Sequence, residues 1–185
     1  MRPDEKPPFW PELLGTIWFI CREVAAWILF IIVIWALFSL NGCGSVYKLP
    51  HKYHPLEEVV EFDLPIIPDT AITTIGTTAY VASLGVFLDR DEGMRHSELL
   101  HEQCHSKRQK NHPLGVTGWL LQYLFDTEFA RVEEEMGWGL ELRYRIAQGY
   151  TLNRPNIVRA LRNYRVLTGK LWGFEEAQRF VDGVR

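Results

Sequence analysis

The stretch His101-Glu102-Gln103-Cys104-His105 is decisive for the fold and chemistry of this chain, because it matches the pattern H-E-x-x-H. On an α-helix, residues four apart lie above one another on one face, so His101 and His105 can direct ring nitrogens at one metal ion. Glu102 lies one step round the helix, where its carboxylate can reach a water molecule on that metal. Two imidazole ligands, an open coordination position and a carboxylate base are what a zinc hydrolase requires. We therefore expect a helix that carries a Zn²⁺ site, with Glu102 as the catalytic base.

The residues around this motif favour a helix of about four turns. Residues 94–100 lead into the motif without Pro or Gly, and the helix is expected to begin near Glu92 or at a cap on Ser97. Cations complement the dipole at the far end of a helix, and three are found there: Lys107, Arg108 and Lys110. Asn111-His112-Pro113 then ends the helix. The competing interpretation is a surface helix that carries two unrelated histidines.

A catalytic zinc ion usually has three protein ligands, so a further ligand is expected downstream. The densest acidic run is Glu133-Glu134-Glu135-Met136, inside a stretch without Pro, Thr127 to Gln148, that predicts a second helix. With H-E-x-x-H on one helix and glutamates on a later one, the chain resembles the gluzincin class of zinc metallopeptidases over about Tyr80 to Tyr150.

In many small and membrane-associated gluzincins, the ligand glutamate opens a motif of the E-x-E-A type. The resemblance therefore implies Glu133 as the third metal ligand, with Glu134 as the alternative. Met136 stands where the motif has Ala, and Gly137 where an Asp usually follows. The remaining acids of the run are interpreted as a solvated helix face. Cys104 is expected to be a small buried hydrophobe, although a thiolate ligand would instead indicate a structural metal site.

The second strong feature is the uncharged run from Val24 to Leu40, VAAWILFIIVIWALFSL. As a helix it spans about 25 Å, close to the thickness of a bilayer core. We expect residues 1–10 to be a disordered tail and residues 11–42 to be a single transmembrane segment with an interfacial lead-in. The alternatives are a buried core helix, a cleaved signal peptide and a lipoprotein. The lipoprotein interpretation arises because Leu40-Asn41-Gly42-Cys43 is similar to a bacterial lipobox.

Residues 43–70 contain four prolines and are expected to form an extended linker with one short strand near Glu58 to Leu64. Ile72 to Leu88 is rich in Thr, Val, Ile and Tyr and predicts a hairpin or a pair of strands. Three further helices are expected, at Leu114 to Phe125, Asn156 to Leu167 and Phe174 to Val184.

These expectations combine into an α+β fold: an N-terminal transmembrane helix, then a helix-dominated, zincin-like domain with a small sheet at residues 71–185. The function expected from the motif and the resemblance is that of a membrane-anchored zinc metallopeptidase acting on peptides or on the peptide stems of a cell wall. The alternative is a non-enzymatic, membrane-anchored structural or virion-assembly protein with a zincin-like fold. The formal net charge of −3 and the scattered cations give no sign of a nucleic-acid partner.

Overall fold

The computed structural model describes residues 44–62 and 72–185, and the compact unit to which they belong runs from Gly44 to Arg185. The unit is an α+β fold, rich in helix, with one small sheet and a short two-stranded ribbon. The expected tail and transmembrane segment, with the alternative lipid-attachment residue Cys43, lie outside the described residues. Among the helices that are described, none is long and apolar enough to cross a membrane.

The four-stranded sheet has the order β1-β2-β4-β3. Its strands are β1 (Val46–Lys48), β2 (Glu58–Glu61), β3 (Ile72–Ile75) and β4 (Thr78–Val81). β2 and β4 run parallel with Val59 opposite Ala79, and the outer pairs are antiparallel. Much of the stretch expected to be a linker is therefore ordered. It contributes β1 and β2 to the sheet, with β2 inside the expected Glu58–Leu64, and the short 3₁₀ helix η1 (His51–Tyr53) lies between the two strands.

The expected hairpin is present as β3 and β4, joined through Gly76, whose φ of 65° favours glycine. Its second strand is shorter than expected, because the chain turns into helix α2 (Leu84–Leu88). Ser83 caps this helix by accepting a hydrogen bond from the amide of Val86. Phe87 and Leu84 are thereby buried against the sheet, in a cluster that also includes Val59.

The helix that carries the motif is α3 (Glu92–Asn111), and it begins at the earlier of the two expected starts because Asp91 caps the amides of Gly93 and Met94. α4 (Gly115–Phe125), α5 (Thr127–Ala147) and α7 (Phe174–Gly183) lie close to their expected positions. α6 is confined to Arg154–Asn163, and the residues expected to continue it form the ribbon of β5 (Arg165–Val166) and β6 (Gly169–Lys170).

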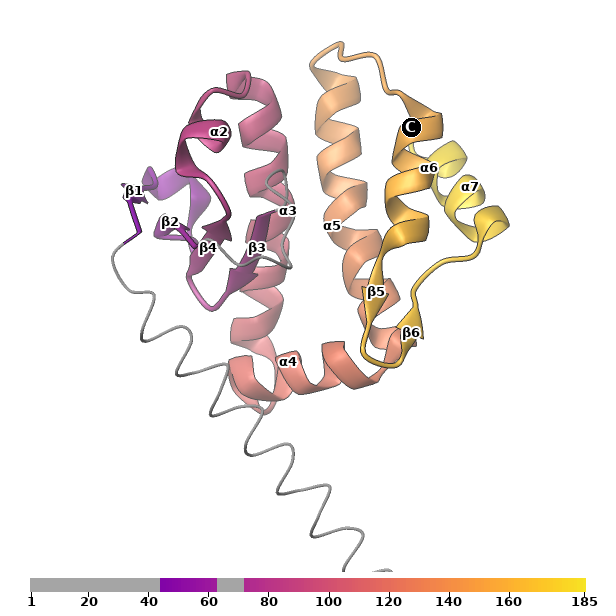
Figure 1. The fold of residues 1–185 in the computed structure, drawn as a ribbon, viewed down its shortest axis with the longest axis horizontal. Coiled ribbons are helices and arrows are strands. Elements are labelled where there is room, and N and C mark those ends of the chain that lie inside the picture. The colour runs from indigo at the N-terminus through magenta and orange to yellow at the C-terminus, as the bar shows by residue number, and fades with distance from the viewer. Residues whose placement is uncertain (1–43, 63–71) are drawn as a thin grey trace, which may run out of the picture. The chain divides into compact units, whose positions relative to one another are not determined.

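Figure 1 shows α3 and α5 standing side by side, with the sheet beside α3, and α6 and α7 beside α5. α4 crosses between one end of α3 and one end of α5. Two apolar clusters support this arrangement, one between the sheet, α2 and α3, and the other among α5, α6 and α7. Most residues of both clusters lie away from the sides of α3 and α5 that face each other. These facing sides hold the buried polar residues of the candidate site instead.

Candidate metal centre

The two histidines of the motif converge as the helical spacing predicts. The Nε2 atoms of His101 and His105 lie 2.9 Å apart. Both side chains face α5, and only 4% of His101 and 5% of His105 is exposed. Two buried imidazole nitrogens directed at one point form half of a tetrahedral metal site.

A carboxylate from α5 completes the group, and it belongs to Glu134. Its Oε2 lies 3.4 Å from His101 Nε2, and its Oε1 lies 3.4 Å from His105 Nε2. Ligands at about 2.0–2.2 Å from a tetrahedral zinc ion are separated from each other by roughly 3.3–3.5 Å. The two separations from Glu134 match this spacing, and the Nε2–Nε2 separation of 2.9 Å is shorter than it. His101, His105 and Glu134 are thus a group that could hold a metal ion.

Glu133, which the gluzincin resemblance implies as the third ligand, lies outside this group. Its carboxylate is fully buried, and both oxygens accept hydrogen bonds of 2.6 Å from Nε of Arg108. Its closest approach to the histidines is 4.0 Å, from Oε2 to His105 Nδ1. Both glutamates contact α3, Glu133 at Arg108 and Glu134 at the histidines. Because neighbouring side chains on a helix point in different directions, the alternative ligand Glu134 is the one that reaches His101 and His105.

Two further side chains hydrogen-bond to two of the three candidate ligands. Glu141 Oε2 lies 3.1 Å from Nδ1 of His101, which leaves Nε2 to face the group. The hydroxyl of Tyr123 donates to Oε1 of Glu134 over 2.5 Å. Outer hydrogen bonds of this kind orient metal ligands in many proteins. His105 lacks such a bond, because its Nδ1 has no partner among the described residues.

The general-base candidate Glu102 is buried beside the group, with 4% of its surface exposed. Its Oε2 makes no regular hydrogen bond within the described chain; the buried hydroxyl of Thr74 on β3 lies close enough to lower the pKa of this carboxyl and makes no other hydrogen bond there. Oε2 of Glu134 is likewise unpartnered. Buried polar atoms in proteins are almost always hydrogen-bonded, so several orphans at one place indicate a site built for a polar ligand.

The charge of the site suits a divalent cation. Four glutamates are buried around the histidines, and two have cationic partners: Glu133 pairs with Arg108, and Glu141 with Arg145. Within the described chain, Glu102 and Glu134 have no Lys or Arg partner. Two buried carboxylates that face only imidazoles are strongly unfavourable when the rings are neutral, and an ion of charge +2 neutralises both. The donor set of imidazole and carboxylate fits zinc, and equally fits other divalent transition metals.

The pKa values of these groups reflect their mutual attraction. Burial raises the pKa of Glu102 above its usual value. Burial also acts to raise the pKa of Glu134, but the adjacent His105 and His101 outweigh it and hold this pKa well below the usual range. For His101, desolvation is outweighed by Glu134 and Glu141, and its pKa is raised well above the ordinary value. The carboxylates thus favour positive charge where the ring nitrogens meet.

Aromatic side chains enclose the group. The ring of Trp138 meets that of His101 edge-on at 5.6 Å, and Trp119 on α4 packs against His105 at 5.7 Å. Trp119 also stacks on Tyr123 at 4.8 Å. An apolar wall of this kind lowers the local dielectric and strengthens the interactions within it.

Other residues considered from the sequence lie elsewhere. Cys104 is half-buried and outside the candidate ligand group, and burial raises the pKa of its thiol. His112 interacts with Gln122 over 3.1 Å. Tyr144 packs against His96. None of these side chains is one of the three candidate ligands.

Several residues of the site were given no role in it from the sequence: Tyr123, Gly137, Trp138, Glu141 and Arg145. Four of them follow Glu134 at three, four, seven and eleven residues along α5, the spacing of one helix face. This polar and aromatic stripe is the signal that could have located them. It would also have favoured Glu134 over Glu133, because Glu134 shares a face with Glu141.

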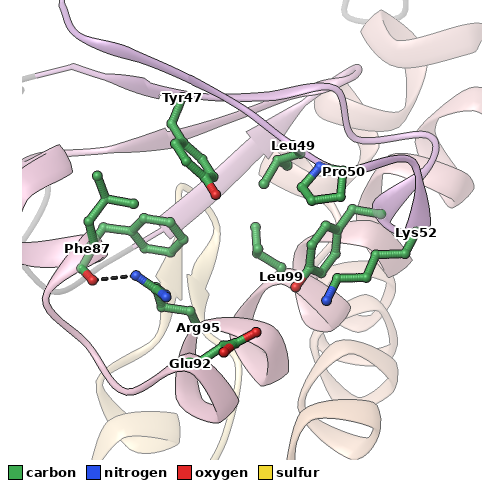
Figure 2. A pocket seen from close by; sticks show the side chains of 10 residues that line it. Tyr47, Leu49, Pro50, Lys52, Phe87, Glu92, Arg95 and Leu99 are labelled. Atoms are coloured by element: carbon green, nitrogen blue, oxygen red, sulfur yellow. Dashed lines mark hydrogen bonds between the residues drawn. The ribbon is translucent and has the colours of Figure 1, made fainter.

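A small cavity lies apart from the metal-ligand group, between β1, η1, α2 and the first turns of α3. Figure 2 shows Tyr47, Leu49, Phe87 and Leu99 around it, with Lys52, Glu92 and Arg95 among the polar lining residues. Its volume is about 80 Å³. Ligand pockets are usually about 300–1,000 Å³, so this cavity is too small for a substrate of ordinary size.

No protein-family model matches this chain, and comparisons with curated proteins and with solved structures give no match. The chemistry of the candidate metal centre is therefore inferred from its own residues and their geometry.

Proposed function

We propose that this chain is a membrane-anchored zinc metallopeptidase, in which His101, His105 and Glu134 hold Zn²⁺ and Glu102 is the general base. The observation that carries the proposal is the convergence of three buried ligand side chains from two helices, with 2.9 Å between the two Nε2 atoms and 3.4 Å from each of them to an oxygen of Glu134. The carboxylate that follows the first histidine is buried beside them with one oxygen that makes no regular hydrogen bond within the described chain. This combination of groups is what metal-assisted hydrolysis uses.

Bound Zn²⁺ would supply an activated water molecule and polarise a substrate carbonyl. The protein's own residues supply the rest. Glu102 accepts the proton of the attacking water and passes it to the leaving amine. Burial raises the pKa of its carboxyl above the usual value. Glu141 and Tyr123 orient His101 and Glu134. The surrounding aromatic rings limit the access of bulk water.

The membrane part of the proposal comes from the sequence. Val24 to Leu40 is uncharged and long enough to approach the thickness of a bilayer core. An anchored enzyme of this kind would act on peptide bonds close to a membrane, in proteins or in the peptide stems of a cell wall.

One observation favours a second candidate, a non-enzymatic protein that uses the metal to stabilise its fold. The ligand residues and Glu102 are all buried, and no described residue of this group lines the cavity of Figure 2. A substrate would need α4 or a neighbouring segment to move before it could reach Glu102. A structural metal site has no such requirement.

Activity separates the two candidates. Purified full-length protein in detergent, loaded with Zn²⁺, is incubated with a mixed peptide library and with a cell-wall preparation, and cleavage is followed by mass spectrometry. The proposal expects new termini with wild type, and a loss of about 10²–10⁴ in rate with Glu102→Gln. Bound zinc should be the same in both proteins. If the Glu102→Gln variant cleaves at the rate of wild type, the catalytic proposal fails. If neither protein cleaves any substrate while both hold zinc, the structural candidate is favoured.

A further inference from the structure

Arg145, on the last turn of α5, occupies a place between the metal-ligand group and the first half of α3. Its guanidinium pairs with Oε1 of Glu141, one turn earlier on the same helix. Its Nε donates to the hydroxyl of Ser97 over 2.9 Å, and its Nη2 lies 3.9 Å from Oε1 of Glu98. The side chain is only 14% exposed, so this cation lies largely within the protein.

Glu141 connects this cation to the candidate ligands. One of its oxygens is taken by Arg145, and the other lies 3.1 Å from Nδ1 of His101. A carboxylate held at one oxygen by a guanidinium has its second oxygen aimed in a fixed direction. Here that direction is toward the imidazole. An ionised carboxylate only accepts, so Nδ1 of His101 carries a proton, and in the neutral ring that a metal ion binds Nε2 presents its lone pair.

The consequence of losing the cation depends on burial. Glu141 is 4% exposed, and no other Lys or Arg of the described chain pairs with it. Without Arg145, the buried carboxylate of Glu141 is an uncompensated charge, which is unfavourable. We expect its side chain to rotate toward solvent. The imidazole of His101 then loses the acceptor that fixes its tautomer and its orientation.

We infer that Arg145 is a positioning residue of the metal centre, which sets the metal affinity of His101 by holding Glu141 against Nδ1. The inference rests on the proposed function only in taking His101 as a ligand. It predicts an indirect effect on metal binding, because Arg145 contacts Glu141, and Glu141 in turn contacts the ligand His101.

A purely mechanical role for Arg145 is the competing account. The same guanidinium joins α5 to Ser97 and Glu98 of α3, so its loss could loosen the two helices without acting through Glu141. The two accounts differ in what other variants do. Ser97→Ala removes the contact to α3 and leaves the Arg145–Glu141 pair. Arg145→Lys keeps a positive charge beside Glu141 but replaces the planar, forked guanidinium with a single ammonium group.

The test uses full-length protein in detergent micelles, with Zn²⁺ as the probe. Zinc affinity is measured by competition with a chromogenic chelator, and thermal unfolding is recorded for the metal-free forms. The variants are Arg145→Gln, Arg145→Lys, Ser97→Ala and Arg143→Gln, an exposed arginine two residues away on the same helix. Arg145→Met replaces Arg145→Gln if the latter does not fold. Histidine ¹⁵N spectra of the metal-free proteins report the tautomer of His101.

The inference expects Arg145→Gln to weaken zinc binding by about 10-fold or more. Arg145→Lys should recover most of the affinity, and Ser97→Ala and Arg143→Gln should bind zinc as wild type does. Recorded at a pH where the ring of His101 is neutral, the spectra should show its proton on Nδ1 in wild type and a mixture of tautomers in Arg145→Gln.

Two results would overturn the inference: unchanged affinity and tautomer in Arg145→Gln, or an equal loss of affinity in Ser97→Ala. If wild type binds no zinc, the proposed function fails by itself. The metal-free spectra then still decide whether Arg145 controls the tautomer of His101, and an unchanged tautomer in Arg145→Gln overturns the inference.

Discussion

Gly137 of α5 lies directly against the ring of His101: a Cβ atom at position 137 would stand 2.6 Å from Nε2 and from Cδ2 of that histidine. Real Cβ atoms do not approach other atoms so closely. A glycine at this position therefore allows α5 to approach α3 closely enough to bring Glu134 to the two histidines. The site therefore requires a residue without a side chain at position 137.

Gly137→Ala should consequently damage the site. The added methyl group must displace the His101 ring or separate the helices, and overpacking of this kind costs about 1–3 kcal/mol of stability. We expect zinc affinity to fall by at least about 10-fold, as measured by chelator competition. Gly139→Ala is the matched control, because a Cβ there meets only Arg143 Nη1 at 3.9 Å. It should raise stability by up to about 1 kcal/mol through helix propensity. Equal zinc affinity in Gly137→Ala and wild type would show that this contact is not needed.

Glu134 and Glu133 should respond differently to the same substitution. Glu134→Gln removes a candidate ligand charge, and the protein should lose its zinc on dialysis. Glu133→Gln should keep the zinc, but the melting temperature should fall, because hydrogen bonds to a charged partner contribute about 1.5–3 kcal/mol and Arg108 would lose its carboxylate. Metal content and thermal unfolding of the two variants check this. The reverse pattern, with zinc lost only from Glu133→Gln, would restore Glu133 as the ligand.

Tyr123→Phe removes a single hydroxyl that donates to Oε1 of Glu134 over 2.5 Å. The ring and its stacking on Trp119 remain, so the fold should be retained. Without the bond, the Glu134 carboxylate is free to rotate, and zinc affinity should fall by about 10-fold. Tyr144→Phe is the control, since Tyr144 packs against His96 and is not one of the candidate ligands. Equal affinities for the two variants would mean that the Tyr123 hydroxyl has no part in holding the ligand.

The sequence predicted the parts of this molecule that depend on local spacing. His101 and His105 meet because four residues make one helical turn, and α3 ends where His112 and Pro113 require it. The choice between Glu133 and Glu134 depends on how α5 is rotated against α3. That rotation is decided by tertiary contacts such as Gly137 on His101.

The misjudged elements have similar causes. β1 has three exposed residues and lies in a stretch rich in proline, so no alternation of apolar residues indicated a strand. It forms because β2 provides a pairing edge. The chain after Asn163 was expected to remain helical, but Tyr164 and Val166 pack against the core formed by α5, α6 and α7, and the backbone becomes extended.

The predicted membrane segment leads to a test on cell fractions. Full-length protein should remain in the membrane pellet after carbonate extraction, and its intact mass should include residues 1–42. Ile32→Arg places a charge in the centre of the uncharged run, at a cost of about 2.5–3.5 kcal/mol for insertion, and should shift protein to the extractable fraction. A mature protein that begins at a lipidated Cys43 would replace the transmembrane segment with a lipid anchor.

Metal content tests the central claim most directly. Full-length protein is purified without added chelator, and its zinc content is measured by elemental analysis for wild type and for His101→Ala. We expect about one zinc ion per chain in wild type and almost none in the variant, because two imidazoles and one carboxylate are the usual protein ligands of such a site. Wild-type protein without zinc or any other divalent metal, or a His101→Ala variant with undiminished metal, would contradict the existence of this metal centre.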